Sequence, residues 1–163
     1  MEQLNHYESL KKVNIKNTNF QILLILCDIS PENVGIILRS AEAFSVSQIL
    51  YYGKNLDKIQ KIKKISRGSK VKLDHTDLLS ILFLTQSGYS LFALEITDTA
   101  KSIEEIKLTD KVCFIVGNEK TGVPSELLSI CDKSYFIPMT GTISSLNVAV
   151  ASSILMYSIF IKA

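Results

Sequence analysis

Five polar side chains fall in three turns of the sequence and could form one binding site: Asn33, Arg39, Glu119, Ser145 and Asn147. Amide, hydroxyl and carboxylate groups orient polar ligands, and a guanidinium binds phosphate or carboxylate through two parallel hydrogen bonds. The second turn, at residues 117–124, begins with a glycine, which lets the backbone approach a ligand closely. This combination of side chains suits a site for a charged ligand.

Arg39 is the member of this set that is hardest to explain by structure alone. The chain contains sixteen lysines and only two arginines, so an arginine at this position is unusual for this sequence. Arg39 also falls within an otherwise apolar helical pattern, where a planar guanidinium suggests bidentate recognition of an anion. The competing explanation is a structural ion pair with Glu42 or Glu119.

The other members of the set each have a simpler structural explanation. Gly117 and Gly122 are typical of a tight turn that binds nothing. Ser145 and Asn147 are residue types that commonly cap the N-terminus of a helix. The residue types alone therefore leave the structural and the functional explanations open.

Alternating strands and helices would position these turns. Residues 20–29 are continuously apolar, as in a parallel strand that is buried on both faces. Ser30 and Pro31 then suit the N-cap and the first position of a helix. Similar patterns predict further strands at 47–53, 89–95, 111–117 and 134–139, and further helices at 54–72, 77–88, 102–107, 123–131 and from near Ser145.

This order of elements predicts the fold class and the place of a ligand. We expect one α/β domain over residues 1–163, with a mostly parallel sheet flanked by helices. In such sheets, ligands bind where the carboxyl ends of the strands lead into turns. The three polar turns all follow predicted strands, so they are expected to converge.

Basic residues cluster at residues 54–72, where eight of the eighteen in the chain accompany a single acid, Asp57. A local positive surface suits RNA, because phosphate neutralisation supplies much of the affinity for a nucleic acid. The alternative is an ordinary solvated helix, because isoleucines recur every three residues from Ile59 onward, between the lysines.

The composition indicates a soluble chain in a reducing compartment. Cys27, Cys113 and Cys131 stand apart among apolar residues, as buried thiols do, so a cytoplasmic location is expected. Two histidines and no CxxC or HxxxH spacing make a metal site unexpected. The start of the chain lacks the pattern of a signal peptide. The uncharged stretch at 146–161 is shorter than the ~20 residues that span a membrane.

Three segments, NVGIILRSAEAF, FIVGNEKTGVP and IPMTGTISSLNVAVASSI, resemble the motifs of the SpoU, or TrmH, family of RNA ribose 2′-O-methyltransferases in the SPOUT superfamily. The third segment is the most specific, and the likeness runs from about Phe20 to Phe160. Ala149 is one departure, because the family usually has serine there. The resemblance implies an α/β fold with a C-terminal trefoil knot, which is an exception among protein chains. It also implies a homodimer and S-adenosylmethionine as the methyl donor.

The resemblance further implies roles for the residues of the three turns. The cofactor-binding residues would be Leu94, Gly117, Ile137, Met139, Ser145 and Leu146. The catalytic residues would be Arg39, Asn33, Glu119, Ser145 and Asn147. The apolar last helix would be buried in the knot and against the partner subunit, where its small residues Ala149, Ala151, Ser152 and Ser153 permit close packing.

Arg39 is expected to clamp the phosphate and ribose of the substrate rather than to act as a general base. Family proposals make this arginine the base, but taking a proton from a guanidinium near neutral pH costs roughly 7–9 kcal/mol. A nearby phosphate would raise the pKa of the guanidinium further. Glu119 is expected to orient the second turn or the ammonium group of the cofactor.

Transfer RNA is favoured over ribosomal RNA as the substrate, because residues 1–19 are too short for the separate N-terminal substrate-binding domain of several ribosomal-RNA members of the family. The candidate RNA-binding residues are Lys61, Lys63, Lys64 and Arg67. One alternative is a catalytically silent RNA-binding or assembly factor on the same fold, which need not bind the cofactor. The other is a flavodoxin-like response regulator, but Asp28 stands alone where that class needs several acids.

Overall fold

Seven strands form one parallel sheet in the computed structural model, which describes residues 20–54, 56 and 58–163. The strands are β1 (Gln21–Cys27), β2 (Gln48–Tyr52), β3 (Lys72–Thr76), β4 (Ser90–Leu94), β5 (Lys101–Ser102), β6 (Lys111–Val116) and β7 (Lys133–Phe136). Their order across the sheet is β3-β2-β1-β6-β4-β7-β5. Residues 1–19, which we treated as too short for a domain, lie outside the described residues, as does Asp57.

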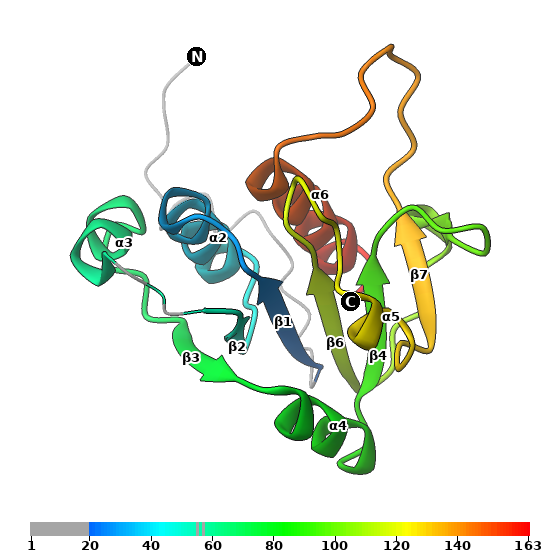
Figure 1. Cartoon of the computed structure of the whole chain (residues 1–163), viewed down its shortest axis with the longest axis horizontal. Coiled ribbons are helices and arrows are strands. Elements are labelled where there is room, and N and C mark those ends of the chain that lie inside the picture. Colours follow the sequence, from blue (N-terminus) through cyan, green and yellow to red (C-terminus); the bar gives the residue numbers. More distant parts are fainter. Residues whose placement is uncertain (1–19, 55, 57) are drawn as a thin grey trace.

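Helices cover both faces of the sheet (Figure 1). They are α2 (Pro31–Ala43), α3 (Ile59–Ile65), α4 (Leu78–Gln86), α5 (Ser125–Leu128) and α6 (Val148–Phe160), with a short 3-10 helix, η1 (Ile103–Glu105). Helices α2, α3 and α6 bury apolar side chains against one face, and α4 and α5 do so against the other. The predicted α/β class, with a parallel sheet flanked by helices, is therefore confirmed. The threading of the chain through a knot stays a prediction.

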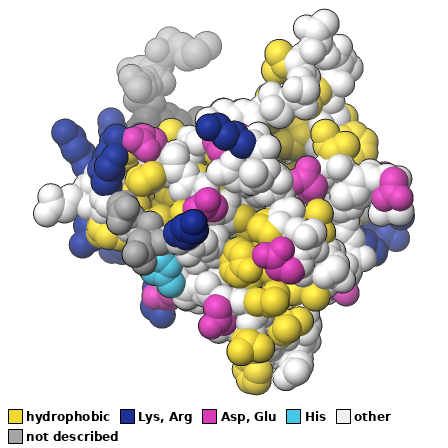
Figure 2. Space-filling view, in the orientation of Figure 1, with side chains coloured by type: hydrophobic (Ala, Val, Ile, Leu, Met, Phe, Trp, Pro, Cys, Tyr) yellow, Lys and Arg dark blue, Asp and Glu magenta, His cyan; other side chains and the backbone are white. Residues whose placement is uncertain are grey.

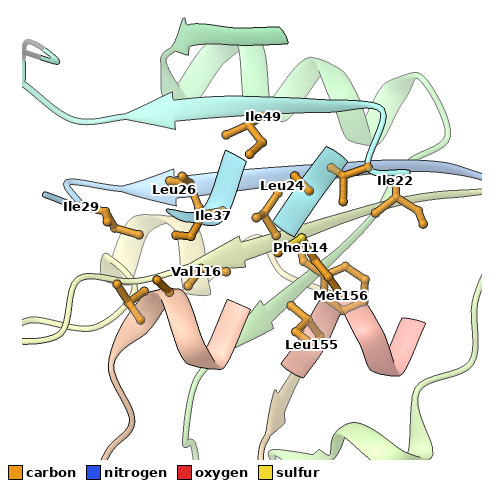
Figure 3. Packing of buried hydrophobic residues seen from close by; sticks show 14 of the residues in the cluster. Ile22, Leu24, Leu26, Ile29, Ile37, Ile49, Phe114, Val116, Leu155 and Met156 are labelled. Carbon is orange, nitrogen blue, oxygen red and sulfur yellow. The ribbon is translucent and has the colours of Figure 1, made fainter. Parts of the chain in front are cut away.

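Strand β1 lies inside the sheet, and every residue after Gln21 in it is buried. Its side chains alternate between the two faces. Leu24 and Leu26 join the cluster that contains Met156 of α6 (Figure 3), whereas Ile25 joins the cluster that contains Leu127 of α5. This two-sided burial explains why the sequence is continuously apolar here and why it predicted the strand well.

Helix α6, the uncharged stretch of the sequence, is a core helix. Leu155 and Met156 are at most 1% exposed. Small side chains bring α6 close to α2: Ser40 Oγ and Ser153 Oγ lie 2.8 Å apart, and Ala149 is fully buried beside them. Within the described part of the chain, none of the helices combines the length and the apolar character needed to cross a membrane.

Helix α3 also packs tightly on α2. A Cβ atom at Gly35 would lie 2.7 Å from Cβ of Ile65, which is closer than real side chains approach, so the contact requires glycine. Ile62 is buried at the same contact surface. The lysines of α3 are therefore held at a short distance from the body of α2.

The lysine-rich segment at 54–72 is not one helix, as the sequence predicted, because α3 covers only Ile59–Ile65. The helix ends where Arg67 and Gly68 take φ angles of 52° and 72°, a left-handed conformation that cannot continue a right-handed helix. Lys72 then begins β3, an edge strand that the prediction missed. Its sequence, KLDHT, is mostly polar, since neither face of this strand is fully buried.

Other boundaries also differ from the prediction. The helix expected at 123–131 is the shorter α5, which covers only Ser125–Leu128. The helix expected at 102–107 is only the 3-10 helix η1, and the two-residue strand β5 precedes it. The last helix begins at Val148 rather than near Ser145. Ile137 and Met139 belong to a loop and not to the last strand, because Pro138 between them has no N–H for a sheet ladder.

Candidate functional site

A cavity of about 560 Å³ opens at the carboxyl ends of β4, β6 and β7. Its wall comes from three segments that are far apart in the sequence: the turn after β4, the turn after β6 and the loop between β7 and α6. All six residues that the sequence analysis gave as cofactor-binding line it: Leu94, Gly117, Ile137, Met139, Ser145 and Leu146. The structure thus brings these residues together, and their role in binding a cofactor stays a prediction.

The turn after β6, which we call the glycine loop (residues 117–123), folds back on itself. Asn118 N donates a hydrogen bond to Gly122 O at 3.2 Å, and Gly122 N donates to Asn118 O at 2.8 Å. A Cβ atom on Gly117 would lie 2.1 Å from the carbonyl carbon of Gly122. Glycine at 117 is therefore required by the close approach of the two ends of the loop, and the loop forms one wall of the cavity.

Asn118 fastens the glycine loop to the end of β1. Its Nδ2 donates to Asp28 O at 2.7 Å, and its Oδ1 accepts from Lys120 N at 2.8 Å. The sequence analysis did not single out Asn118. The signal was available, because asparagine in a turn often bonds to the backbone two residues further on.

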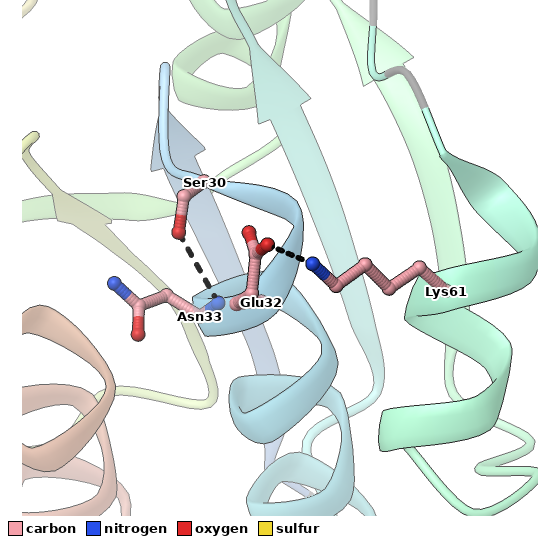
Figure 4. A network of polar contacts seen from close by, with 4 residues as sticks. All are labelled: Ser30, Glu32, Asn33 and Lys61. Atoms are coloured by element: carbon pink, nitrogen blue, oxygen red, sulfur yellow. Dashed lines mark hydrogen bonds and ion pairs between the residues drawn. The ribbon is translucent and has the colours of Figure 1, made fainter.

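Three of the five predicted catalytic residues form one hydrogen-bonded chain. Asn33 Nδ2 donates to Glu119 Oε1 at 2.5 Å, and Asn147 Nδ2 donates to Asn33 Oδ1 at 3.3 Å. The start of α2 positions Asn33: Pro31 occupies the first turn, and Ser30 Oγ accepts from Asn33 N at 3.4 Å (Figure 4). The beginning of α2, the glycine loop and the beginning of α6 therefore meet at one place.

Asn147 and Ser145 differ in their structural roles. Asn147 Oδ1 accepts hydrogen bonds from Ala149 N at 2.9 Å and from Val150 N at 3.3 Å, so Asn147 is the N-cap of α6. Its amide nitrogen remains for the contact with Asn33. Ser145 does not cap the helix; it is exposed and lines the cavity, in the loop that projects from the body of the molecule in Figure 1.

Arg39 lies on the exposed side of α2 and does not line the cavity, as far as the described residues show. Neither carboxylate that competed to explain it is its partner. Glu42 Oε2 accepts hydrogen bonds from Lys70 N at 2.8 Å and Val71 N at 3.1 Å, and Glu119 accepts from Asn33. An ion pair with Glu42 or Glu119 therefore does not explain Arg39. Within the described part of a single chain, Arg39 also does not contact the other candidate residues.

The four predicted RNA-binding residues lie on or just after α3, and Figure 2 shows Lys and Arg side chains gathered on that side of the molecule. Lys61 forms an ion pair with Glu32 of α2 (Figure 4), and this hydrogen bond holds the pKa of the Glu32 carboxyl below its ordinary value. Both side chains are about half exposed, so the pair stabilises little. Lys63, Lys64 and Arg67 are exposed.

Glu95 lines the same cavity and was also missed by the sequence analysis. It is the last residue of the strand predicted at 89–95 and follows β4 directly in the structure. A carboxylate at the carboxyl end of a parallel strand is a recognisable signal, because ligand sites of α/β sheets form there. The charged side chains of the cavity wall are Glu95, Glu119 and Lys120.

The sequence and the fold both match known proteins. The family model described as the SpoU rRNA Methylase family matches residues 21–157. A tRNA (guanosine(18)-2'-O)-methyltransferase from Escherichia coli K12 is 32% identical over 133 residues. That match covers 78% of this chain and 57% of the relative, so the chain spans little more than half the length of that protein.

Two crystal structures have similar folds. The Aquifex aeolicus TrmH/SpoU tRNA modifying enzyme aligns with a TM-score of 0.78 and 26% identity, over 96% of this chain and 83% of that one. The SpoU methyltransferase AviRb from Streptomyces viridochromogenes, in complex with AdoMet, aligns with a TM-score of 0.80 and 23% identity, over 90% of this chain and 59% of that one. The second likeness supports the fold alone.

Proposed function

Because the chain belongs to the SpoU rRNA methylase family, we propose that it transfers a methyl group from S-adenosylmethionine to a ribose 2′-hydroxyl of RNA. The observation that carries this proposal is the convergence of three turns on one cavity, with Asn33, Glu119 and Asn147 linked beside it. The named relatives act on transfer RNA, so we favour transfer RNA over ribosomal RNA as the substrate.

The lining of the cavity fits S-adenosylmethionine. Its volume of about 560 Å³ is within the usual range for small-molecule sites, roughly 300–1,000 Å³. Leu94, Ile137 and Leu146 offer apolar surface to an adenine ring, and the close-packed glycine loop offers backbone groups. The carboxylates of Glu95 and Glu119 favour the positive charge of the cofactor. When bound, S-adenosylmethionine supplies an electrophilic methyl group on a sulfonium.

The hydrogen-bonded chain of Asn33, Glu119 and Asn147 would position the acceptor ribose. Amide groups can donate to and accept from a ribose hydroxyl, and the chain fixes the amides in place before the substrate arrives. Holding the 2′-oxygen in line with the methyl group lowers the entropic part of the barrier. The hydroxyl proton would pass to solvent water with or after methyl transfer, which leaves S-adenosylhomocysteine as the second product.

Arg39 would hold the substrate phosphate and ribose as a bidentate clamp. Its exposed position and its lack of a protein partner among the described residues leave the guanidinium available for RNA. The lysines of α3, together with Arg67, would contact the phosphates that flank the acceptor nucleotide.

We propose a homodimer that forms through α2 and α6. Large apolar side chains remain exposed on these two adjacent helices and directly after α6: Ile36, Val150, Tyr157, Phe160 and Ile161. Arg39 follows Ile36 by three residues, so both lie on the same side of α2. A second copy that covers these side chains would place Arg39 at the interface, where it can reach the partner subunit's cavity.

We also propose that the described residues form one catalytic domain and that the protein works in the cytoplasm. Cys27, Cys113 and Cys131 are all unpaired, which agrees with a reducing compartment. Burial raises the pKa of the Cys27 thiol to about 12, so this residue resists oxidation.

The proposed activity can be tested with purified protein, S-adenosylmethionine and unmodified transcripts of transfer and ribosomal RNA. We expect mass spectrometry of the digested transfer RNA to detect a 2′-O-methylated nucleoside, and calorimetry to detect binding of S-adenosylhomocysteine. Absence of both signals would overturn the proposal and favour a silent RNA-binding factor. Methylation of ribosomal RNA alone would overturn the preference for transfer RNA. Comparing 2′-O-methyl maps of cells with and without the gene would then identify the nucleotide.

A further inference from the structure

Glu95 makes hydrogen bonds that the proposed reaction does not by itself require. Its Oε2 accepts from Val123 N, in the glycine loop, at 2.8 Å, and its Oε1 accepts from Ile96 N at 3.0 Å. Its own N–H donates to Tyr135 O of β7 at 2.9 Å. Glu95 therefore links three segments around the cavity: the end of β4, the end of β7 and the loop after β6.

The carboxylate of Glu95 also fills space beside Gly122. A Cβ atom built on Gly122 would lie 2.5 Å from Glu95 Oε2, and Gly122 has a φ angle of 69°. The carboxylate thus occupies the place where a side chain at 122 would stand. Because Gly122 pairs with Asn118 through two backbone hydrogen bonds, fixing Gly122 and Val123 also fixes the start of the glycine loop.

The other side-chain hydrogen bonds of the glycine loop connect it to the end of β1 and to α2, on the side away from β4. Asn118 Nδ2 donates to Asp28 O, directly after β1, and Glu119 accepts from Asn33 of α2. Glu95 provides the side-chain contact with β4, on the side of the loop that also lines the cavity. Removing the carboxylate would leave Val123 N without its acceptor and that wall of the cavity without its support.

From this geometry we infer that Glu95 is a positioning residue for cofactor binding. Its carboxylate holds the glycine loop in the form that binds S-adenosylmethionine. This role rests on the proposed function, because it concerns the same cavity. A carboxylate suits the role, since its two oxygens accept two backbone N–H groups at once, and hydrogen bonds to a charged acceptor are the stronger kind.

The test compares Glu95→Ala and Glu95→Gln with Asp98→Ala, a matched control. Asp98 is an exposed carboxylate three residues later that does not line the cavity in the described structure. Calorimetry with S-adenosylhomocysteine should give a dissociation constant about tenfold higher for Glu95→Ala. Glu95→Gln keeps one acceptor oxygen, so we expect a partial rescue, to roughly threefold above the unmodified protein. Asp98→Ala should bind as the unmodified protein does.

Steady-state kinetics separate positioning from general stability. For Glu95→Ala, the KM for S-adenosylmethionine should rise while the KM for RNA stays unchanged. A purely structural role would instead lower the melting temperature of Glu95→Ala below that of Asp98→Ala and raise both KM values, and that result would overturn the inference. If Glu95→Ala does not fold, the KM values of Glu95→Gln for S-adenosylmethionine and for RNA test the inference in the same way.

Substitution of Gly122 adds an independent check. Gly122→Ala should weaken binding in the unmodified chain, because the new methyl group displaces the Glu95 carboxylate. In Glu95→Ala the displacement no longer occurs, so the second substitution should weaken binding less than it does alone. Equal effects in both backgrounds would overturn the proposed coupling.

The failure of this inference differs from the failure of the proposed function. If the unmodified protein does not bind S-adenosylhomocysteine, the proposed function fails and the role of Glu95 fails with it. If the unmodified protein and Glu95→Ala bind equally well, only the role of Glu95 is overturned.

Discussion

Asn33 and Arg39 lie on the same helix, yet only Asn33 contacts other candidate residues. Six residues separate them, so they point in different directions around α2. Asn33 faces the glycine loop, and Arg39 faces solvent. Under the proposed function, the two residues would therefore contact different parts of the substrate.

The bidentate clamp is tested by Arg39→Lys, which keeps the charge and loses the planar fork. We expect kcat to fall roughly 10- to 100-fold, equivalent to about 1.4–2.7 kcal/mol of transition-state stabilisation. Calorimetry should give an unchanged dissociation constant for S-adenosylhomocysteine, because the proposed clamp holds the phosphate and ribose of the RNA and not the cofactor. Near-normal turnover of Arg39→Lys would contradict the clamp.

The residue types in the three turns were readable from the sequence, but their contacts were not. Glycine at 117 and the polar residues at 33, 119 and 147 stand out by type and by position after predicted strands. The bond between Asn33 and Glu119 joins residues 86 positions apart, and only the sheet order brings them together. Glu95 and Asn118 each carried a signal in residue type and position, but their contacts could not be read from the sequence, because their partners are backbone groups.

At the scale of elements, the beginning of α6 has two functions. Asn147 caps the helix with its carbonyl oxygen and contacts Asn33 with its amide nitrogen. Helix stability and site geometry thus depend on different atoms of one side chain.

These two functions can be separated by comparing Asn147→Asp with Asn147→Ala. Aspartate keeps an oxygen for the cap but has no amide to donate to Asn33, so we expect near-normal thermal stability and a large loss of activity. Alanine loses both, and the free energy of unfolding should fall by about 1 kcal/mol. Thermal melting and methyl transfer measure the two effects. Full activity of Asn147→Asp would show that its contact with Asn33 is dispensable.

The basic surface of α3 is tested by the salt dependence of RNA binding. The logarithm of the RNA association constant falls linearly as the logarithm of the salt concentration rises. Lys63→Ala and Lys64→Ala should each make this negative slope less steep by about 1, because each removes one phosphate contact. Lys133→Ala, an exposed lysine of β7, is the matched control and should leave the slope unchanged. Equal slopes for all four proteins, measured with transfer RNA, would exclude α3 as the RNA-binding surface.

Elements with a strong apolar pattern were predicted well, and polar or irregular ones were not. β1 and β6 are buried on both faces, and their sequences are correspondingly apolar. β3 lies at the edge of the sheet with the sequence KLDHT, and no pattern separates it from the lysine-rich segment before it. The end of α3 depends on a positive φ angle at Arg67, a residue type that seldom adopts one.

At the scale of the whole molecule, two groups of exposed apolar side chains lie on opposite sides of the sheet. One lies on α2 and α6, where we propose the dimer interface. The other includes Leu79 and Phe83 of α4, on the opposite side of the sheet. A substitution on the α4 surface can therefore serve as the control for a substitution at the proposed dimer interface.

Tyr157→Glu should convert the protein to a monomer, because it places a charge on an apolar interface. Light scattering should then give the 18.2 kDa mass of one chain instead of twice that mass. If Arg39 acts across the interface, methyl transfer is lost as well. Leu79→Glu, on α4, should leave both mass and activity unchanged. A monomeric unmodified protein that retains full activity would exclude the proposed dimer.

The contact between Gly35 and Ile65 has a consequence for the choice of nucleotide. Because Gly35 has no side chain, Ile65 packs directly on the backbone of α2, and the lysines of α3 stand at a set offset from Asn33. If the lysines bind the RNA phosphates, as we propose, this offset would select which ribose along the strand reaches the methyl donor. A bulkier residue at position 35 would then move the modification along the strand, which mapping of 2′-O-methyl groups on transfer RNA would detect.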